Sequence, residues 1–462
     1  MINQRVEKDF LGELKVPKDA YWGIHTQRAI HNFHISGRSV NPSLIRALAR
    51  VKMACCLANA ETGYLSQDKS LVIQKACLEI SEGLLADQFP VDAMQGGAGT
   101  STNMNINEVI ANRAIEHFGG QKGDYGVIHP LEDINLHQST NDVYPTAIKV
   151  ATIHRLRDLA SAITQLQGAF QEKEKEFADI VKLGRTELQE AVPITLGAEF
   201  SAFAEAFSRD RWRTFKCEER LRVVNLGGTA VGTGLAAPRN YIFLVIEKLR
   251  EVTGLGLSRG ENILGETANA DTFVEVSAIL KAHAVNLIKI ANDLRLMNFL
   301  GEILLPHLQA GSSIMPGKVN PVLAEAVIQT GIKVIANDGI VTEAAVRGTL
   351  QINEFLPLLA HALLESLDLL INIDGLLTKY VRAITANKEN CEEYFNASPT
   401  IITALLPIIG YEKATQFIAE FSSGNQDNMR QFLENKLGKE LIGQIFSPYQ
   451  LTALGYKDKK NE

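Results

Sequence analysis

The sequence lacks the patterns that mark disulfide-rich, metal-binding and secreted proteins. Its five cysteines form no CxxC pair, and the adjacent Cys55 and Cys56 lie in an alanine-rich apolar run. That placement favours buried, reduced thiols and a cytoplasmic protein. None of the ten histidines belongs to an HxH or HExxH pattern, so we expect no metal site. Residues 1–9 are mostly polar, so we expect no signal peptide.

The sequence also lacks an excess of positive charge and any uninterrupted apolar run of bilayer length. Its formal net charge is −7 over 462 residues, which argues against nucleic acid as a partner. Charged residues interrupt the apolar stretches, so we expect no membrane-spanning helix. Residues 457–462 are polar, and we expect this tail to be disordered. The 46% of hydrophobic residues is enough for a large core.

Helical periodicity dominates the chain, and strand-like alternation is short and rare. Apolar residues recur every three or four positions along 142–176 and 270–299, which predicts two long amphipathic helices. A helix of about 30 residues spans roughly 45 Å, and helices of that length favour a bundle. We expect further helices over 40–62, 68–86, 103–117, 321–343 and 355–385. The sequence thus predicts a mainly α protein.

One glycine-flanked loop concentrates polar groups suited to binding an anion. It reads Gly311-Ser312-Ser313-Ile314-Met315-Pro316-Gly317-Lys318-Val319-Asn320-Pro321, and we call it the signature loop. We expect Asn320 to cap a helix that begins at Pro321, which would set Lys318 and a helix N-terminus beside one anion site. Gly311 and Gly317 would act as hinges of a lid. The alternative is an ordinary Gly/Ser/Pro loop before a helix.

Three other loops offer small hydroxyl and amide side chains just before a helix: residues 96–103, 138–142 and 184–189. Such groups bind anions without adding bulk, but Ser, Thr and Asn are also ordinary helix caps. The Gly/Thr-rich run 225–234 is neither a P-loop nor a dinucleotide-binding turn, because no Gly-Lys-Ser/Thr follows it and no strand-turn-helix unit frames it.

In order and content, these loops resemble the fumarase/aspartase superfamily. The resemblance extends from about Arg5 to Gly455, and segments 87–92, 191–193 and 225–234 are more similar to the ammonia-lyases acting on L-aspartate than to the fumarases. It implies a three-domain fold with a central bundle of long helices, divided at 1–137, 138–387 and 388–462. It also implies a homotetramer in which three subunits build each active site, an amino-dicarboxylate substrate, and no cofactor.

The implied reaction is the anti-elimination of ammonia from L-aspartate to give fumarate through an aci-carboxylate dianion. The site must stabilise that second negative charge with donors fixed in advance. By resemblance, Ser312 is the general base, acting as an alkoxide stabilised by backbone N–H groups and Lys318. The carboxylate that becomes the dianion would be bound by Thr100, Ser139, Thr140 and Ser313. The other carboxylate would be bound by Thr186, Lys318 and Asn320, and the amine would face Thr100, Asn141 and Glu187.

Two departures from the family pattern bear on the substrate. Glu187 stands where the family more often has His or Gln, and a carboxylate there attracts an ammonium group more than a hydroxyl. Alternatively, Glu187 points away and pairs with Arg185 or another cation. The chain is also several residues shorter near 297–302 than its family. A class II fumarate hydratase and a lyase for a related or N-substituted amino-dicarboxylate therefore remain alternatives. A catalytically silent structural protein is a further one, which the intact signature loop disfavours.

Overall fold

The computed structural model describes residues 4–424 and 426–456, so the predicted disorder of the 457–462 tail lies outside the described residues. The chain is mainly helical, which confirms the predicted fold class. It divides into two compact units, each assembled from three stretches of chain. Unit 1 comprises 1–160, 213–282 and 333–370, and unit 2 comprises 161–212, 283–332 and 371–462. The three-domain division stays a prediction.

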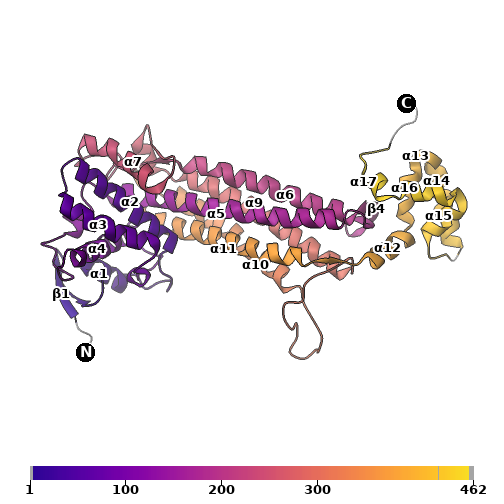
Figure 1. Cartoon of the computed structure of the whole chain (residues 1–462), viewed down its shortest axis with the longest axis horizontal. Coiled ribbons are helices and arrows are strands. Elements are labelled where there is room, and N and C mark those ends of the chain that lie inside the picture. Colours follow the sequence, from indigo (N-terminus) through magenta and orange to yellow (C-terminus); the bar gives the residue numbers. More distant parts are fainter. Residues whose placement is uncertain (1–3, 425, 457–462) are drawn as a thin grey trace. The chain divides into compact units, whose positions relative to one another are not determined.

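The helices and strands follow one another along the chain (Figure 1). The helices are α1 Ile24–Asn32, α2 Pro42–Glu61, α3 Gln67–Glu82, α4 Thr100–His117, α5 Thr140–Glu176, α6 Leu196–Cys217, α7 Arg239–Thr253, α8 Ile263–Ala268, α9 Asp271–Phe299, α10 Val322–Val346, α11 Leu356–Arg382, α12 Lys388–Ala397, α13 Leu406–Ile409, α14 Tyr411–Ser423, α15 Met429–Leu437, α16 Lys439–Ile445 and α17 Pro448–Thr452. The strands form two-stranded sheets: β1 Gln4–Asp9 with β2 Gly12–Pro17, β3 Val181–Thr186 with β4 Gln189–Thr195, β5 Val223–Val224 with β6 Ser258–Arg259, and β7 Ile303–Leu304 with β8 Thr385–Ala386.

The predicted helices are present, and the differences lie at their ends. Helix α4 begins at Thr100 and not at Asn103. Gly99 precedes it with a φ of +92°, and a Cβ there would lie 2.7 Å from the Tyr144 ring. The close approach of this ring explains why the helix starts directly after a glycine. Helix α10 begins at Val322, one residue later than predicted.

In unit 2, an aromatic cluster and a buried ionic group join the long helices. Phe170 of α5 packs against three phenylalanines of α6, at Phe200, Phe203 and Phe207. His283 of α9 lies 2.9 Å from Asp210 of α6 and 3.0 Å from Asp374 of α11. Burial opposes the charged imidazole, but the two carboxylates outweigh it and raise the pKa of His283 to about 10. These contacts fix which faces of the helices meet in unit 2.

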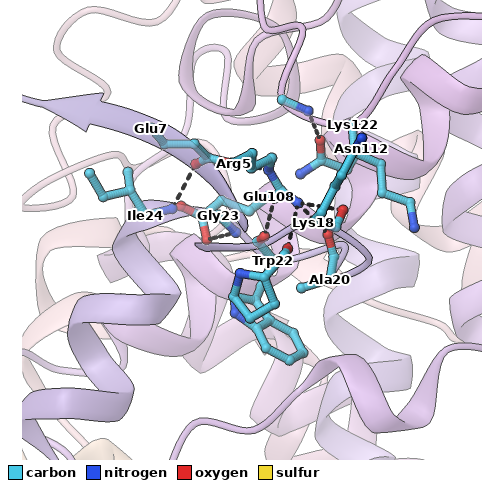
Figure 2. A network of polar contacts seen from close by, with 12 residues as sticks. Arg5, Glu7, Lys18, Ala20, Trp22, Gly23, Ile24, Glu108, Asn112 and Lys122 are labelled. Atoms are coloured by element: carbon cyan, nitrogen blue, oxygen red, sulfur yellow. Dashed lines mark hydrogen bonds and ion pairs between the residues drawn. The ribbon is translucent and has the colours of Figure 1, made fainter. Parts of the chain in front are cut away.

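In unit 1, two buried carboxylates hold the start of α1 (Figure 2). Glu108 of α4 accepts hydrogen bonds from the backbone N–H groups of Gly23 and Thr26, and Glu7 accepts one from Ile24. A Cβ at Gly23 would lie 2.6 Å from the Glu7 carboxylate, so this close approach requires glycine. The two carboxylates thus accept from N–H groups that have no partner within the helix at its start.

Among the described helices, only α11 is long and apolar enough to cross a membrane, judged by length and composition. Of its apolar window, 61% is buried inside the protein. One such helix is weak evidence for a membrane, because the core helix of a globular protein meets the same criteria.

Candidate functional site

The segment Gln138–Asp142, which we call the Ser139 segment, is fixed by a buried carboxylate. Asp142 is fully buried and accepts hydrogen bonds from the backbone N–H groups of Ser139 (3.0 Å), Gly227 and Thr229 (both 3.1 Å). Burial raises the pKa of Asp142 to about 6, against the opposing effect of these three donors. Asp142 therefore ties the Ser139 segment to the Gly/Thr-rich loop 225–234.

A buried lysine lies beneath the same segment. Lys52 of α2 is 1% exposed, and its Nζ donates to Asn135 Oδ1 (2.9 Å) and Gln138 Oε1 (2.8 Å). Asn135 Oδ1 also accepts from the Asn103 and Asn107 amides of α4. Burial lowers the pKa of Lys52 to about 8. Its hydrogen-bond partners are neutral amides, and the Asp142 carboxylate in the same segment partly opposes this lowering of the pKa.

The predicted carboxylate-binding hydroxyls of unit 1 lie at two neighbouring helix starts. Thr140 begins α5 and accepts a hydrogen bond from the Asn103 amide at 3.2 Å. Ser139 Oγ accepts from the backbone N–H of Asn141 at 3.2 Å. Thr100 begins α4 and is exposed, and its hydroxyl donates to the Gly97 carbonyl at 2.7 Å. The Asn103–Thr140 contact thus joins the two helix starts.

Asn141 is held by the Gly/Thr-rich loop. Its side-chain amide donates to the Ala230 carbonyl at 2.7 Å, and its own carbonyl accepts from the Asn225 amide at 2.9 Å. Asn225 also donates to Thr267 of α8. The Gly/Thr-rich loop, to which the sequence assigned no role in the site, therefore supports a predicted site residue.

The signature loop, in unit 2, is exposed and is closed by few hydrogen bonds. Ser312 Oγ accepts from the backbone N–H groups of Ile314 (3.2 Å) and Met315 (2.9 Å). The Gly311 N–H donates to the Lys318 carbonyl at 2.7 Å. A Cβ on Gly311 would lie 2.8 Å from that carbonyl, so the closure of the loop requires glycine. Within the described part of the chain, the ammonium group of Lys318 makes no ion pair.

The predicted capping role of Asn320 is wrong. Its side-chain amide donates to the Gly311 carbonyl at 3.0 Å, and helix α10 begins two residues later. Asn320 therefore closes the base of the signature loop. The helix N-terminus still follows the loop directly, but its first N–H groups do not depend on the Asn320 side chain.

Thr186 and Glu187 lie at the tip of the β3–β4 hairpin in unit 2. Both are exposed, and Glu187 and Leu188 have positive φ values of +53° and +62°. The expected alternative pairing of Glu187 with Arg185 is absent, because Arg185 pairs with the buried carboxylate of Glu302. Lys182 pairs with the other oxygen of Glu302 at 2.7 Å. Arg185 is thus engaged by Glu302, and the side chain of Glu187 is exposed to solvent.

The predicted residues are divided between the units. Thr100, Ser139, Thr140 and Asn141 belong to unit 1, and Thr186, Glu187, Ser312, Ser313, Lys318 and Asn320 belong to unit 2. Sequence reasoning missed Lys52, although a signal existed. Lys52 falls in a helical stripe with Leu44, Leu48 and Cys55, and a lysine on an apolar face is rarely buried without a polar partner.

Other kinds of site to consider in the described residues are a metal centre and an apolar cavity. Over residues 4–424 and 426–456, no group of three or more His, Cys, Asp or Glu residues is placed to hold a metal ion. A cavity of about 830 Å³ among the C-terminal helices of unit 2 is lined by apolar groups such as Val192, Ile408 and Leu451. It contains none of the predicted site residues.

Comparisons with known proteins identify what the whole chain is similar to. A family model described as lyase matches residues 12–336. An aspartate ammonia-lyase from a Bacillus species is 43% identical over 99% of both chains. A crystal structure titled fumarate lyase:delta crystallin from Brucella melitensis, bound to cobalt, has a TM-score of 0.93 and 44% identity, covering 98% of this chain and 100% of that one. A class II fumarase from Schistosoma mansoni has a TM-score of 0.90 and 30% identity, covering 97% and 99%.

Proposed function

The chain belongs to the fumarase/aspartase superfamily, and we propose that it is a carbon–nitrogen lyase that converts L-aspartate into fumarate and ammonia. The aspartate ammonia-lyase from Bacillus is 43% identical to it, and the Schistosoma class II fumarase is 30% identical. This difference favours the ammonia-lyase over the hydratase.

The observation that carries the proposal is the environment of the Ser312 hydroxyl. A serine can act as a base near neutral pH only if its alkoxide is stabilised, because its ordinary pKa is far above 7. Two backbone N–H groups, from Ile314 and Met315, already point at Ser312 Oγ. Hydrogen bonds to the charged form of a group favour that form, so the signature loop supplies what a serine base needs.

The proposed reaction begins when the Ser312 alkoxide removes a proton from the carbon beside one carboxylate. The electron pair of that C–H bond moves into the carboxylate and gives an aci-carboxylate dianion. When the dianion collapses, a C=C bond forms, the C–N bond breaks, and the ammonium group leaves as ammonia. The proton stays on Ser312 until solvent or a neighbouring group removes it. No redox step or cofactor is needed for this balance.

Stabilisation of the dianion is assigned to the hydroxyls of Thr100, Ser139, Thr140 and Ser313. Support comes from the polar network that fixes Ser139 and Thr140, with Lys52 beneath it. A single well-placed donor to a developing oxyanion contributes about 3 kcal/mol. A cation behind such donors adds favourable potential at the place where the second charge develops.

The other substrate carboxylate is assigned to Lys318, Asn320 and Thr186. The ammonium group of Lys318 is exposed on the signature loop and has no competing acid among the described residues. The Asn320 amide is engaged with the Gly311 carbonyl, so binding through Asn320 requires that it exchange this acceptor for the substrate. The amine is assigned to Asn141, Thr100 and Glu187.

A second candidate substrate, an N-substituted or more strongly cationic amino-dicarboxylate, is favoured by Glu187. Its carboxylate is exposed at the tip of the β3–β4 hairpin and is not neutralised by Arg185. A free carboxylate on the amine side would attract additional positive charge on the leaving group.

The assembly proposed for this chain is a homotetramer with three domains per subunit, acting in the cytoplasm. Support comes from the separation of the predicted site residues into two units of one chain, because such a site can be completed by neighbouring subunits. Sedimentation and mixing of two inactive variants, one altered in each unit, would test it. Recovered activity in the mixture supports shared sites, and its absence contradicts them.

The experiment that tests the function follows fumarate by ultraviolet absorbance when the purified protein is mixed with L-aspartate or, separately, with L-malate. Fumarate from aspartate alone supports the proposal. Fumarate from malate alone would make the protein a fumarase and would contradict the role of Glu187. If neither substrate reacts, N-substituted aspartates are tested next, and turnover of these alone would support the second candidate.

A further inference from the structure

A cavity of about 540 Å³ lies in unit 1, among α7, α8, β6 and the Gly/Thr-rich loop. Gly232 and Gly234 contribute backbone to its wall, with φ values of +89° and +69°. A Cβ on Gly232 would lie 2.6 Å from the backbone of Ile263 and Leu264, which shows how closely the loop is packed against α8. None of the predicted site residues lines this cavity.

Two arginines that line the cavity lie near one aromatic ring. Arg239 at the start of α7 and Arg259 at the end of β6 both line it. Their guanidinium carbons lie 5.9 Å and 5.0 Å from the centre of the Phe243 ring. Within the described residues, neither guanidinium makes an ion pair. The two guanidinium groups are like charges that line one cavity, and an anion bound by both would offset their mutual repulsion.

The remaining polar groups of the cavity are mostly donors. Asn262 Oδ1 accepts from the Gly265 N–H at 3.1 Å and caps α8, so the NH₂ of Asn262 is the part of its side chain left for a ligand. Thr233 adds a hydroxyl. Glu261 is the one acid in the lining, and its single charge leaves the arginines in excess.

We propose that this cavity, with Arg239, Arg259 and the Asn262 amide as donors, binds a small divalent oxyanion, either a dicarboxylate or phosphate. Guanidinium groups bind carboxylate and phosphate oxygens in a bidentate manner. This site is separate from the proposed catalytic one and does not depend on the proposed reaction.

The cavity is connected to the Ser139 segment through the Gly/Thr-rich loop. The loop that forms its wall also donates two N–H groups to Asp142, from Gly227 and Thr229. The Ala230 carbonyl of the same loop accepts a hydrogen bond from the Asn141 side-chain amide. A ligand in the cavity would therefore contact one side of a loop whose other side holds a predicted amine-binding residue.

Calorimetric titration of the intact protein with inorganic phosphate, and separately with succinate, tests the proposal without any turnover. We expect a dissociation constant of about 1 mM or tighter at low ionic strength, weakened by salt. The double variant Arg239→Gln/Arg259→Gln should weaken binding at least about tenfold. The matched control Arg250→Gln/Arg211→Gln removes two other exposed arginines that do not line the cavity, and it should bind as the native protein does.

Two further variants make the result decisive. Asn262→Asp keeps the oxygen that caps α8 but replaces the donor with a negative charge, so it should weaken binding by a similar factor while the protein stays folded. Lys318→Ala removes the proposed carboxylate-binding cation of the signature loop and should leave this binding unchanged. Preference for phosphate or for succinate identifies which oxyanion the site takes.

Several outcomes would overturn the proposal. Binding that is lost in Lys318→Ala and kept in the arginine double variant would place the anion at the catalytic site. Equal weakening in the matched control would show non-specific attraction to surface charge. No heat and no shift in melting temperature with either anion, in a protein that turns over L-aspartate, would overturn this site and leave the proposed function intact.

Discussion

The Ser139 segment of unit 1 and the signature loop of unit 2 carry similar side chains in opposite settings. In the Ser139 segment, Asp142 is fully buried and Thr140 is 8% exposed. In the signature loop, Ile314 is 85% exposed. The first is tied by hydrogen bonds to three other segments, from α2, α4 and the Gly/Thr-rich loop. The hydrogen bonds that close the signature loop mostly join residues within the loop itself.

The difference matches two requirements of the proposed reaction. Donors that stabilise a developing charge are most effective when they are fixed before the reaction, and buried polar networks provide this. A base that must first admit and then enclose the substrate needs a segment that can move, and sparse contacts permit this. We infer that unit 1 supplies the prearranged half of the site and the signature loop supplies the movable half.

The largest expected effect comes from Ser312→Ala. Removal of a general base typically costs about 10²–10⁴-fold in rate, so we expect fumarate formation from L-aspartate to fall by at least about 1,000-fold. Because Ser312 is on an exposed loop, the melting temperature and oligomeric state should not change. Ser313→Ala, one residue away, is the matched control, and it should retain more activity than Ser312→Ala. Activity within tenfold of the native level in Ser312→Ala would contradict the assignment of the base.

The next effect tests the prearranged half through Lys52→Met. This change keeps the length of the side chain but removes the donor to Asn135 and Gln138 and the charge beneath the Ser139 segment. We expect kcat/KM for L-aspartate to fall about 100-fold, since a displacement of about 1 Å at a binding residue can cost that much. Lys149→Met, at a second buried lysine that pairs with Glu266, is the control and should have a smaller effect on kcat/KM.

The same lysine gives a pH dependence of stability with a defined sign. Burial lowers the pKa of Lys52 to about 8 from an ordinary value of 10.5, so between these pH values the unfolded chain binds more protons than the folded one. Stability from this group therefore rises with pH across that window, by roughly 1 kcal/mol per pH unit. The melting temperature of the native protein, relative to that of Lys52→Met, should therefore increase between pH 8 and 10.5. A constant difference in melting temperature would contradict the lowered pKa of Lys52.

The sequence predicted the long helices because their apolar stripes repeat over many turns, and periodicity of that length is unambiguous. It predicted Asn320 wrongly because an Asn-Pro pair before a helix is a local capping pattern. The Asn320 amide instead reaches the Gly311 carbonyl, nine residues earlier. Local pattern cannot anticipate the closure of a loop on itself.

The supports of the site were the hardest part to predict. Asp142 stands in the first turn of α5, but its Oδ2 accepts hydrogen bonds from a loop more than 80 residues later in the chain. Residues with direct chemical roles form local motifs and can be recognised by resemblance. Their supports depend on contacts between distant segments, which one sequence does not reveal. The roles assigned to the ten site residues stay predictions.

A smaller effect is expected from Glu187→Gln, which removes the charge at the tip of the β3–β4 hairpin and keeps its size. If Glu187 faces the amine, preference for L-aspartate over L-malate should fall by about tenfold, equivalent to roughly 1.4 kcal/mol of attraction to the ammonium group. Competition between the two substrates, followed by fumarate yield, measures this. Glu190→Gln is the control. Glu190 is on the same hairpin, and its carboxylate accepts a hydrogen bond from the Ser398 hydroxyl. An unchanged preference in Glu187→Gln would remove Glu187 from the amine side.

The last prediction compares the Ser139 segment and the signature loop directly, by amide hydrogen exchange and without a measurement of activity. Amide hydrogen exchange should be at least about 100-fold faster at Ile314 and Met315, whose N–H groups bond only to Ser312 Oγ, than at Gly227 and Thr229, whose N–H groups bond to the buried Asp142. Ser312→Ala should accelerate exchange at the first pair alone. Because exchange reports opening of the segment itself, equal protection of both pairs would show that the signature loop is as fixed as the Ser139 segment. Closure of the loop would then have to come from movement of a larger part of unit 2.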